Sequence, residues 1–242
     1  MPEYEEIEVL MDSPYYMFVA SLPTFPVAWE SARILPVSPV RLEGRLDNLL
    51  TKDDHDTVHF FERTLFGFNF DADEVFLDKI DDLMQQARKI SSQLTEACAY
   101  LIETRLLIGL IRRSIKGKSL PENFEERWAV HLDAQLVEAV TENWARPDFG
   151  LRIDYPWIEK MRQYIESDQA LQSENFLNQM LWRKLSDIDF HSGFDMSAAI
   201  LYVFRWHVMR QRISHMPEES LEIINEQIEA IVGHTEIDYN EC

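Results

Sequence analysis

The stretch from residue 144 to residue 212 decides the fold of this chain, and it reads WARPDFGLRIDYPWIEKMRQYIESDQALQSENFLNQMLWRKLSDIDFHSGFDMSAAILYVFRWHVMRQR. A break at 146–151 opens it, and helices are expected at about 154–166 and 171–185. A second break, His191-Ser192-Gly193, precedes a long apolar helix that Asp195 can cap. Within the first break, Gly150 allows unusual backbone dihedral angles and Asp148 can act as a cap, so we interpret this break as structural.

Helix signals also dominate the chain before this stretch. Ser38 and Thr51 are typical N-cap residues, and Pro39 suits a first helical position. After a turn at Gly67-Phe68-Asn69, the spacing predicts further helices at about 73–84, 95–116 and from Pro121 to Trp144. A last helix is expected over 217–233.

The short apolar run 15–23 fits a strand or a helix, because periodicity cannot separate the two over so few residues. The sequence therefore predicts an all-α (mainly α) bundle of several helices with Pro/Gly breaks. One short N-terminal strand over residues 15–23 is left open as an alternative to helix. We expect a single helical domain over 1–242, with a subdivision into 1–120 and 121–242 as the alternative. The acidic ends, 1–12 and 234–242, are expected to be flexible.

The charge balance restricts the kinds of partner. The chain has 23 Lys and Arg against 43 Asp and Glu, a formal net charge of −20. Because contacts with phosphates and anionic lipids need cations, this balance disfavours nucleic acid and direct adsorption to a membrane. The acidity suits a cationic protein partner, or it serves solubility alone.

The two cysteines, Cys98 and Cys242, form no multi-cysteine pattern, which is typical of a reducing compartment. The acidic start lacks the basic region of a signal peptide, and no uninterrupted apolar run is long enough to insert into a bilayer. We therefore expect a cytoplasmic protein.

Several groups of residues are candidates for a metal-binding or catalytic site. His55 and His59 are four apart on one helix face, but with no third ligand identifiable in the sequence they predict no closed metal site. The acidic residues that begin at Asp71 do not match a calcium loop and are read as a solvated helix start. His207 and His215 have no visibly paired nucleophile. We expect no catalytic residue, metal, cofactor or small-molecule substrate.

A basic island interrupts the acidic chain, with no acidic residue between its first and last members. Cations are favoured at a helix C-terminus, where they could also pair with the chain's own acidic tail. The other interpretation is a dock for an acidic partner or a lipid headgroup. The island consists of Arg105, Arg112, Arg113, Lys116 and Lys118.

Six aromatic side chains at helical spacing are interpreted as core rather than as an aromatic binding patch. They are Trp157, Trp182, Trp206, Tyr155, Tyr164 and Tyr202.

A set of short motifs carries a family resemblance. They are the N-terminal run 15–23 and the positions Arg146, Asp148, Phe149, Gly150, Leu151, Tyr155, Ile158, Glu159, Met161, Trp182, Phe194, Asp195, Tyr202 and Arg212. Together they resemble a bacterial family linked to V-type (A/V-type) ATP synthases, whose members look like shortened C subunits, called d in eukaryotic vacuolar enzymes. That subunit is an all-helical funnel that couples the central stalk to the membrane rotor ring.

The resemblance implies a non-enzymatic component of a complex for proton or sodium transport, either a C/d-like adaptor between stalk and ring or an assembly factor. Its partners would be V-type ATP synthase subunits, which would hold it at the periphery of the inner membrane. The motif residues would be structural or partner-binding. This chain is shorter than a typical C subunit and shows no three-fold internal repeat, so both roles stay open. The alternatives are a free-standing acidic helical interaction or regulatory protein and, less favoured, a metal-dependent helical enzyme using His55 and His59.

Overall fold

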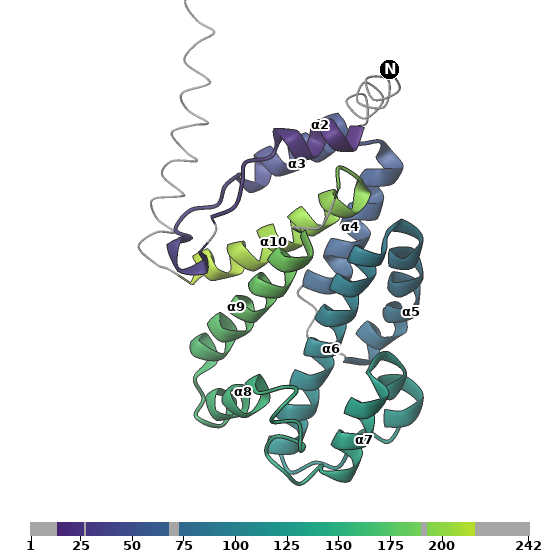
Figure 1. The fold of residues 1–242 in the computed structure, drawn as a ribbon, viewed down its shortest axis with the longest axis vertical. Helices are drawn as coiled ribbons and strands as arrows, with labels where there is room; N and C mark the ends of the chain where they lie inside the picture. The colour runs from purple at the N-terminus through teal and green to yellow at the C-terminus, as the bar shows by residue number, and fades with distance from the viewer. Residues whose placement is uncertain (1–13, 27, 68–72, 190–192, 216–242) are drawn as a thin grey trace, which may run out of the picture.

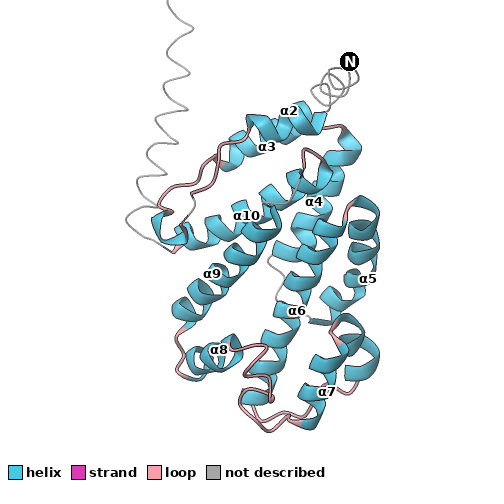
Figure 2. Cartoon of the chain, in the orientation of Figure 1, coloured by secondary structure: helices cyan, strands magenta, loops and turns pink. Residues whose placement is uncertain are grey.

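The computed structural model describes residues 14–26, 28–67, 73–189 and 193–215. These residues form helices and no strand (Figure 2). The α-helices are α2 (Pro14–Ser21), α3 (Pro39–Leu49), α4 (Lys52–Phe66), α5 (Asp73–Ile90), α6 (Ser92–Ile115), α7 (Ala134–Glu142), α8 (Trp157–Glu166), α9 (Ala170–Asp189) and α10 (Met196–Ser214). The expectation of an all-α bundle is confirmed.

Helix α6 runs through the middle of the molecule and contacts α5, α8, α9 and α10 (Figure 1). Helices α7 and α8 lie near its C-terminal end, and α2 and α3 lie beyond its other end. The buried apolar side chains form one cluster that extends from Phe18 to Ile213 and so draws on both halves of the chain. Cys98 is a free, buried thiol within this core. No helix within the described ranges is both long and apolar enough to cross a membrane.

Helix starts follow the caps that the sequence indicated. The hydroxyl of Ser38 accepts a hydrogen bond from the backbone N–H of Arg41, and the hydroxyl of Thr51 accepts one from Asp54. A carboxylate oxygen of Asp195 accepts from the N–H of Ala198 at 3.1 Å. Because the first N–H groups of a helix have no intrahelical partner, these side chains fix where α3, α4 and α10 begin.

The strand alternative at 15–23 is wrong. Residues 14–21 form α2, and Tyr15, Phe18, Val19 and Leu22 turn toward the core. Their spacing of three, four and seven residues is that of one helix face.

The helical stretch expected from Pro121 to Trp144 is not one continuous helix. The chain forms a π-turn at Phe124–Trp128 and a 3-10 turn at Ala129–His131 before α7 begins at Ala134. Phe124 and Trp128 are both buried, and the wide π-turn brings the two rings into the core together. Asp133 then caps α7 by accepting from the N–H of Gln135.

Several helix boundaries differ from expectation. Helix α6 begins at Ser92 rather than Thr95, and α8 begins at Trp157 rather than Asp154, while α5 ends at Ile90 rather than Met84 and α9 ends at Asp189 rather than Leu185. Ser91 caps α6, and Pro156 precedes α8. Several expectations fall outside the described residues: the acidic ends, the last helix over 217–233, Cys242, Asp71, and parts of the turns at 67–69 and 191–193.

Candidate functional site

The motif residues Arg146, Asp148, Phe149, Gly150 and Leu151 form the turn between α7 and α8. Phe149 and Gly150 have positive φ angles of 53° and 74°, and the N–H of Gly150 donates to the carboxylate of Asp148 at 2.9 Å. Asp148 thus caps the turn itself. Phe149 is fully buried and stacks on Trp144, while Leu151 is also buried.

Arg162 of α8 ties this turn to α6. Its Nε donates to the carbonyl of Pro147 at 2.7 Å, and its Nη2 donates to the hydroxyl of Ser114 at 2.9 Å. The backbone N–H of Arg146 donates to the carbonyl of Asn143, and the Arg146 side chain is exposed. These contacts hold the turn against α6 and α8.

A second group of motif residues, on α9 and α10, contacts the segment formed by residues 22–26 and 28–38, which we call the N-terminal strap. The hydroxyl of Tyr202 donates to the carbonyl of Pro23, and Nε of Arg212 donates to the carbonyl of Ala32. The ring of Trp182 meets Phe25 edge to face. Phe194 is half exposed and packs on the ring of Tyr16. The motif positions therefore lie in separate places and do not converge on one pocket.

Tyr155 connects the motif turn to α6 through a half-buried carboxyl group. Its hydroxyl donates to Oε1 of Glu103 at 3.0 Å. Burial raises the pKa of the Glu103 carboxyl above its ordinary value, and the hydrogen bond from Tyr155 offsets only part of this rise. Burial, followed by the nearby charge of Glu103, likewise raises the pKa of the Tyr155 phenol. The pair thus joins α6 to the segment before α8.

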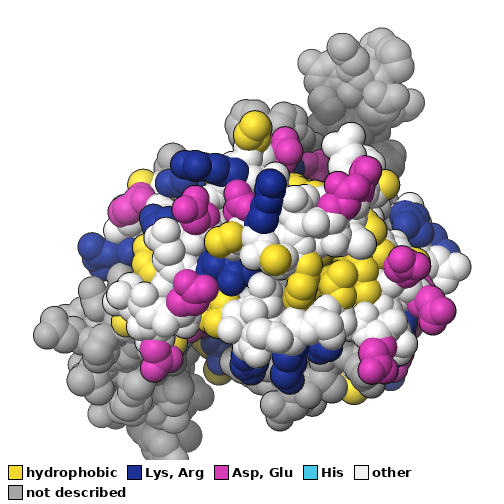
Figure 3. All heavy atoms as spheres, turned by 90° about the horizontal axis from the view of Figure 1, so that it is seen from below, with side chains coloured by type: hydrophobic (Ala, Val, Ile, Leu, Met, Phe, Trp, Pro, Cys, Tyr) yellow, Lys and Arg dark blue, Asp and Glu magenta, His cyan; other side chains and the backbone are white. Residues whose placement is uncertain are grey.

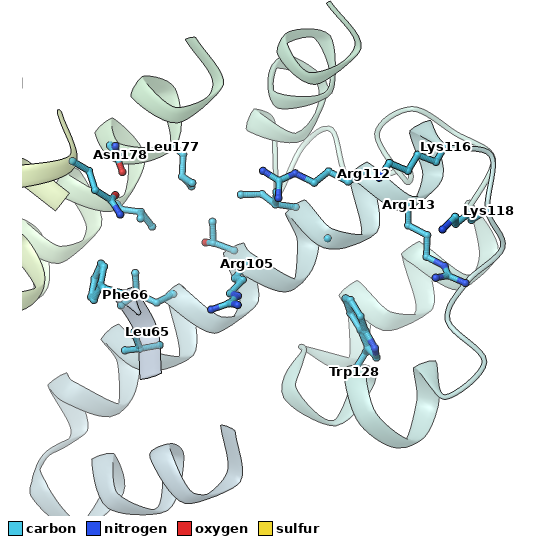
Figure 4. Close-up of a pocket in the computed structure, with 16 residues that line it drawn as sticks. Leu65, Phe66, Arg105, Arg112, Arg113, Lys116, Lys118, Trp128, Leu177 and Asn178 are labelled. Atoms are coloured by element: carbon cyan, nitrogen blue, oxygen red, sulfur yellow. The ribbon is translucent and has the colours of Figure 1, made fainter. Parts of the chain in front are cut away.

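A pocket of about 350 Å³ lies along α6 and contains the whole basic island. We call it the basic groove. Its walls come from α4, α6, α9 and the π-turn (Figure 4). The lining residues are Leu65, Phe66, Leu101, Thr104, Arg105, Ile108, Gly109, Arg112, Arg113, Lys116, Lys118, Trp128, Leu177, Asn178, Leu181 and Gln211. No acidic side chain is among them.

The two ends of the basic groove differ in chemistry. Leu65, Phe66, Leu177 and Asn178 lie at one end, whereas the cations Arg112, Arg113, Lys116 and Lys118 gather at the other (Figure 4). The cationic end coincides with the C-terminus of α6, where positive charge is favoured by the helix dipole.

The cations differ in how they are held. The guanidinium of Arg105 lies 3.8 Å from the ring centroid of Phe76, and Nε of Arg113 donates to the carbonyl of Ser119. Arg112, Lys116 and Lys118 form no ion pair with any side chain in the described part of the chain. On the face seen in Figure 3, Lys and Arg side chains lie beside an area of hydrophobic ones. In the groove itself, Arg112, Lys116 and Lys118 are exposed, and the lining also includes apolar side chains.

Asn178 is a polar group without a partner at the apolar end. Its residue is 1% exposed, and neither its Oδ1 nor its Nδ2 has a hydrogen-bond partner in the described residues. Buried amides are normally paired, so this one is a candidate for contact with a bound group or water. The sequence signal was present: Asn178 interrupts the apolar face of α9 formed by Leu181, Trp182 and Leu185.

The other candidate residues are the acidic residues of α5 and the histidines, which make separate contacts. Asp78, Asp81 and Asp82 are exposed on α5, and Asp78 pairs with Arg127, which fits a solvated acidic face. His207 contacts Glu62, and His215 contacts Glu174; of the described groups, no serine or cysteine is paired with either ring. His55 and His59 turn their rings toward Glu43 of α3, a carboxylate that the spacing of the histidines did not identify.

No family model, no curated protein and no solved structure matches this chain.

Proposed function

We propose that this chain is a non-enzymatic helical adaptor whose basic groove receives an acidic amphipathic segment of a partner protein. The observation that carries the proposal is the division of the groove into an apolar end with Asn178 and a cationic end at the C-terminus of α6. An amphipathic helix with carboxylates near one end matches both parts, and helix-in-groove docking is a recurrent mode of recognition.

Charge supports a protein segment as the occupant. The groove collects five of the 23 Lys and Arg of a chain whose net charge is −20. A partner with a broad negative surface, such as nucleic acid or an anionic bilayer, meets repulsion from the rest of the chain. A short acidic segment contacts the groove alone and avoids that repulsion.

The choice of partner complex rests on the motif resemblance. We propose a subunit of a bacterial V-type ATP synthase, with this chain acting at the junction of stalk and rotor ring or in its assembly. In this role the chain is attached to the membrane through its partners, and the partners carry the ion. The exposed Arg146 and Phe194 are the motif positions best placed to contribute further contacts.

A free-standing helical interaction protein is the second candidate, since the basic groove fits an acidic segment from any source. The two candidates share the docking site and differ in the identity of the partner. Isolation of native partners therefore separates them.

The test is affinity purification of the tagged full chain from gently solubilised native membranes, with partners identified by mass spectrometry. We expect stalk and rotor subunits in fixed ratio for a structural subunit and in substoichiometric amounts for an assembly factor. Recovery of other proteins in place of these subunits would favour the free-standing interaction protein.

A pair of double variants tests the groove itself. Arg112→Glu with Lys116→Glu reverses charge at the cationic end, and we expect at least tenfold less partner recovered. Arg88→Glu with Lys89→Glu makes the same change in the last turn of α5 and controls for the loss of favourable helix-end charge. Equal recovery with both double variants would contradict docking in the groove.

A further inference from the structure

Two pairs of potential ligands face each other across α3 and α4. His55 and His59 are four apart on α4, and Glu43 and Asp47 are four apart on α3. Residues at this spacing lie on one face of a helix. Only residues 50–51 separate the two helices, so the two faces are held together by a short connection as well as by packing.

Three ligand atoms form a compact triangle. Nε2 of His55 lies 3.1 Å from Nε2 of His59, and Oε1 of Glu43 lies 3.1 Å from the first nitrogen and 3.0 Å from the second. Ligands about 2.0 Å from a tetrahedral Zn²⁺ lie about 3.3 Å from one another. The triangle therefore needs to widen by only a few tenths of an ångström, on the order of ordinary side-chain adjustment, to hold such an ion.

The hydrogen bond on the far side of His59 orients its ring for metal binding. Nδ1 of His59 lies 2.6 Å from Oε2 of Glu62, whose other oxygen lies 2.7 Å from Nε2 of His207. A carboxylate accepts, so Nδ1 of His59 carries the hydrogen and the lone pair of the neutral ring is on Nε2, inside the triangle. A carboxylate behind a ligating histidine is the usual support of a metal site.

The triangle has more lone pairs than hydrogens. When both rings are neutral, Nε2 of His59 and Oε1 of Glu43 can only accept, and His55 can supply one hydrogen at most. Asp47 adds a carboxylate oxygen 3.2 Å from Nε2 of His55. A divalent cation at the centre would satisfy these lone pairs together and offset the carboxylate charge.

We propose that Glu43, His55 and His59 bind one divalent transition metal ion of the kind that prefers imidazole, with Zn²⁺ as the test ion, and that the ion clasps α3 to α4. The carboxylate side of the site adjoins a hollow of about 600 Å³ lined by Glu43, Asp47 and Glu62 among others. The site shares no residue with the basic groove, so it stands apart from the proposed adaptor function.

The first test is titration of Zn²⁺ into the metal-free full chain by calorimetry. We expect one ion per chain and an affinity at least about 100-fold weaker in the double variant His55→Gln with His59→Gln, because two of three ligands are lost. His215→Gln is the matched control, since that ring also faces a glutamate, Glu174 at 2.9 Å, and belongs to no group of three ligands among the described residues. We expect its affinity to equal that of the unaltered chain.

Two further variants keep the test independent of folding. The side chain of Glu43 is 49% exposed, so Glu43→Gln removes a ligand with little effect on the core, and we expect at least tenfold weaker binding. Glu62→Gln removes no ligand but alters the support of His59, together with the contact to His207, and a loss of about 10- to 100-fold is expected. Zn²⁺ should raise Tm in the unaltered chain but not in the double variant. Absence of stoichiometric binding, or equal binding by the double variant, would overturn the proposal and leave these rings as ion-pair partners only.

Discussion

The hydroxyl of Tyr202 on α10 donates a hydrogen bond of 3.0 Å to the carbonyl of Pro23, which lies 179 residues earlier in the chain. One turn later, the indole N–H of Trp206 donates to the carbonyl of Val37 at 2.9 Å. The two bonds hold the N-terminal strap at both of its ends. Together with the bond from Arg212 to Ala32, side chains of α10 thus satisfy three backbone carbonyls of the strap.

Removal of the Tyr202 hydroxyl should loosen the strap. We expect Tyr202→Phe to lower the free energy of unfolding by about 1 to 2 kcal/mol, because the half-buried carbonyl of Pro23 loses its donor. Urea denaturation followed by circular dichroism measures the change. Tyr164→Phe is the control, since the Tyr164 hydroxyl makes no hydrogen bond in the described residues. Equal losses in the two variants would show that the bond to Pro23 contributes nothing.

Gly150 should not tolerate a side chain. Its φ of 74° is unfavourable for L-residues, and an added Cβ would lie 3.0 Å from Nδ2 of Asn143. We expect Gly150→Ala to destabilise the fold by about 1 to 2 kcal/mol or more. Gly44→Ala is the comparison, because Gly44 is within α3 and a Cβ there meets nothing within 4 Å. Thermal melts should show the opposite sign for Gly44→Ala, a gain of about 0.5 to 1 kcal/mol.

Glu103 should give the chain a measurable dependence of stability on pH. Its folded-state pKa is raised above the ordinary value of 4.5, chiefly by burial. Its contribution to stability is therefore fully present below the ordinary pKa and is lost as pH rises through the folded-state pKa. Glu103→Gln keeps an acceptor for Tyr155 and does not ionise. The free energy of unfolding of Glu103→Gln, relative to the unaltered chain, should therefore increase as pH rises above 4.5 and through the folded-state pKa.

Denaturant titrations at several pH values provide the measurement for Glu103. Glu125→Gln, at an exposed position, controls for the loss of one negative charge from an acidic chain. A difference between Glu103→Gln and the unaltered chain that stays constant with pH would contradict the expected effect of burial.

The buried amide of Asn178 should lower the free energy of unfolding and strengthen binding of the partner. Because its buried amide has no hydrogen-bond partner among the described residues, Asn178→Leu should raise the free energy of unfolding by about 1 to 2 kcal/mol. The same variant should bind partner more weakly, since it removes the polar group at the apolar end of the basic groove. Unfolding and partner recovery are measured on the same preparations, with Asn175→Leu, a half-buried position on α9 outside the groove, as the control. A loss of stability in Asn178→Leu would contradict an unpaired amide.

Much of the fold follows from local signals. Ser38, Thr51 and Asp195 each cap the helix that follows them, because their side chains reach the N–H groups three residues on. The apolar spacing of Tyr15, Phe18 and Leu22 was also sufficient for a helix, although the run was too short for periodicity to exclude a strand. The π-turn at Phe124–Trp128 was not predictable in this way, since the requirement to bury two large rings against distant helices overrides helix propensity.

The sequence by itself determined an all-helical chain, its main caps, the turn at Gly150 and the basic island, because each depends on neighbours within a few residues. Only the tertiary structure decided what the island lines and what the histidines face. The basic groove needs α4, α6 and α9 together, and the triangle at His55 and His59 needs Glu43 from another helix. Both arise from contacts between helix faces, whose relative placement is set by packing of the shared core.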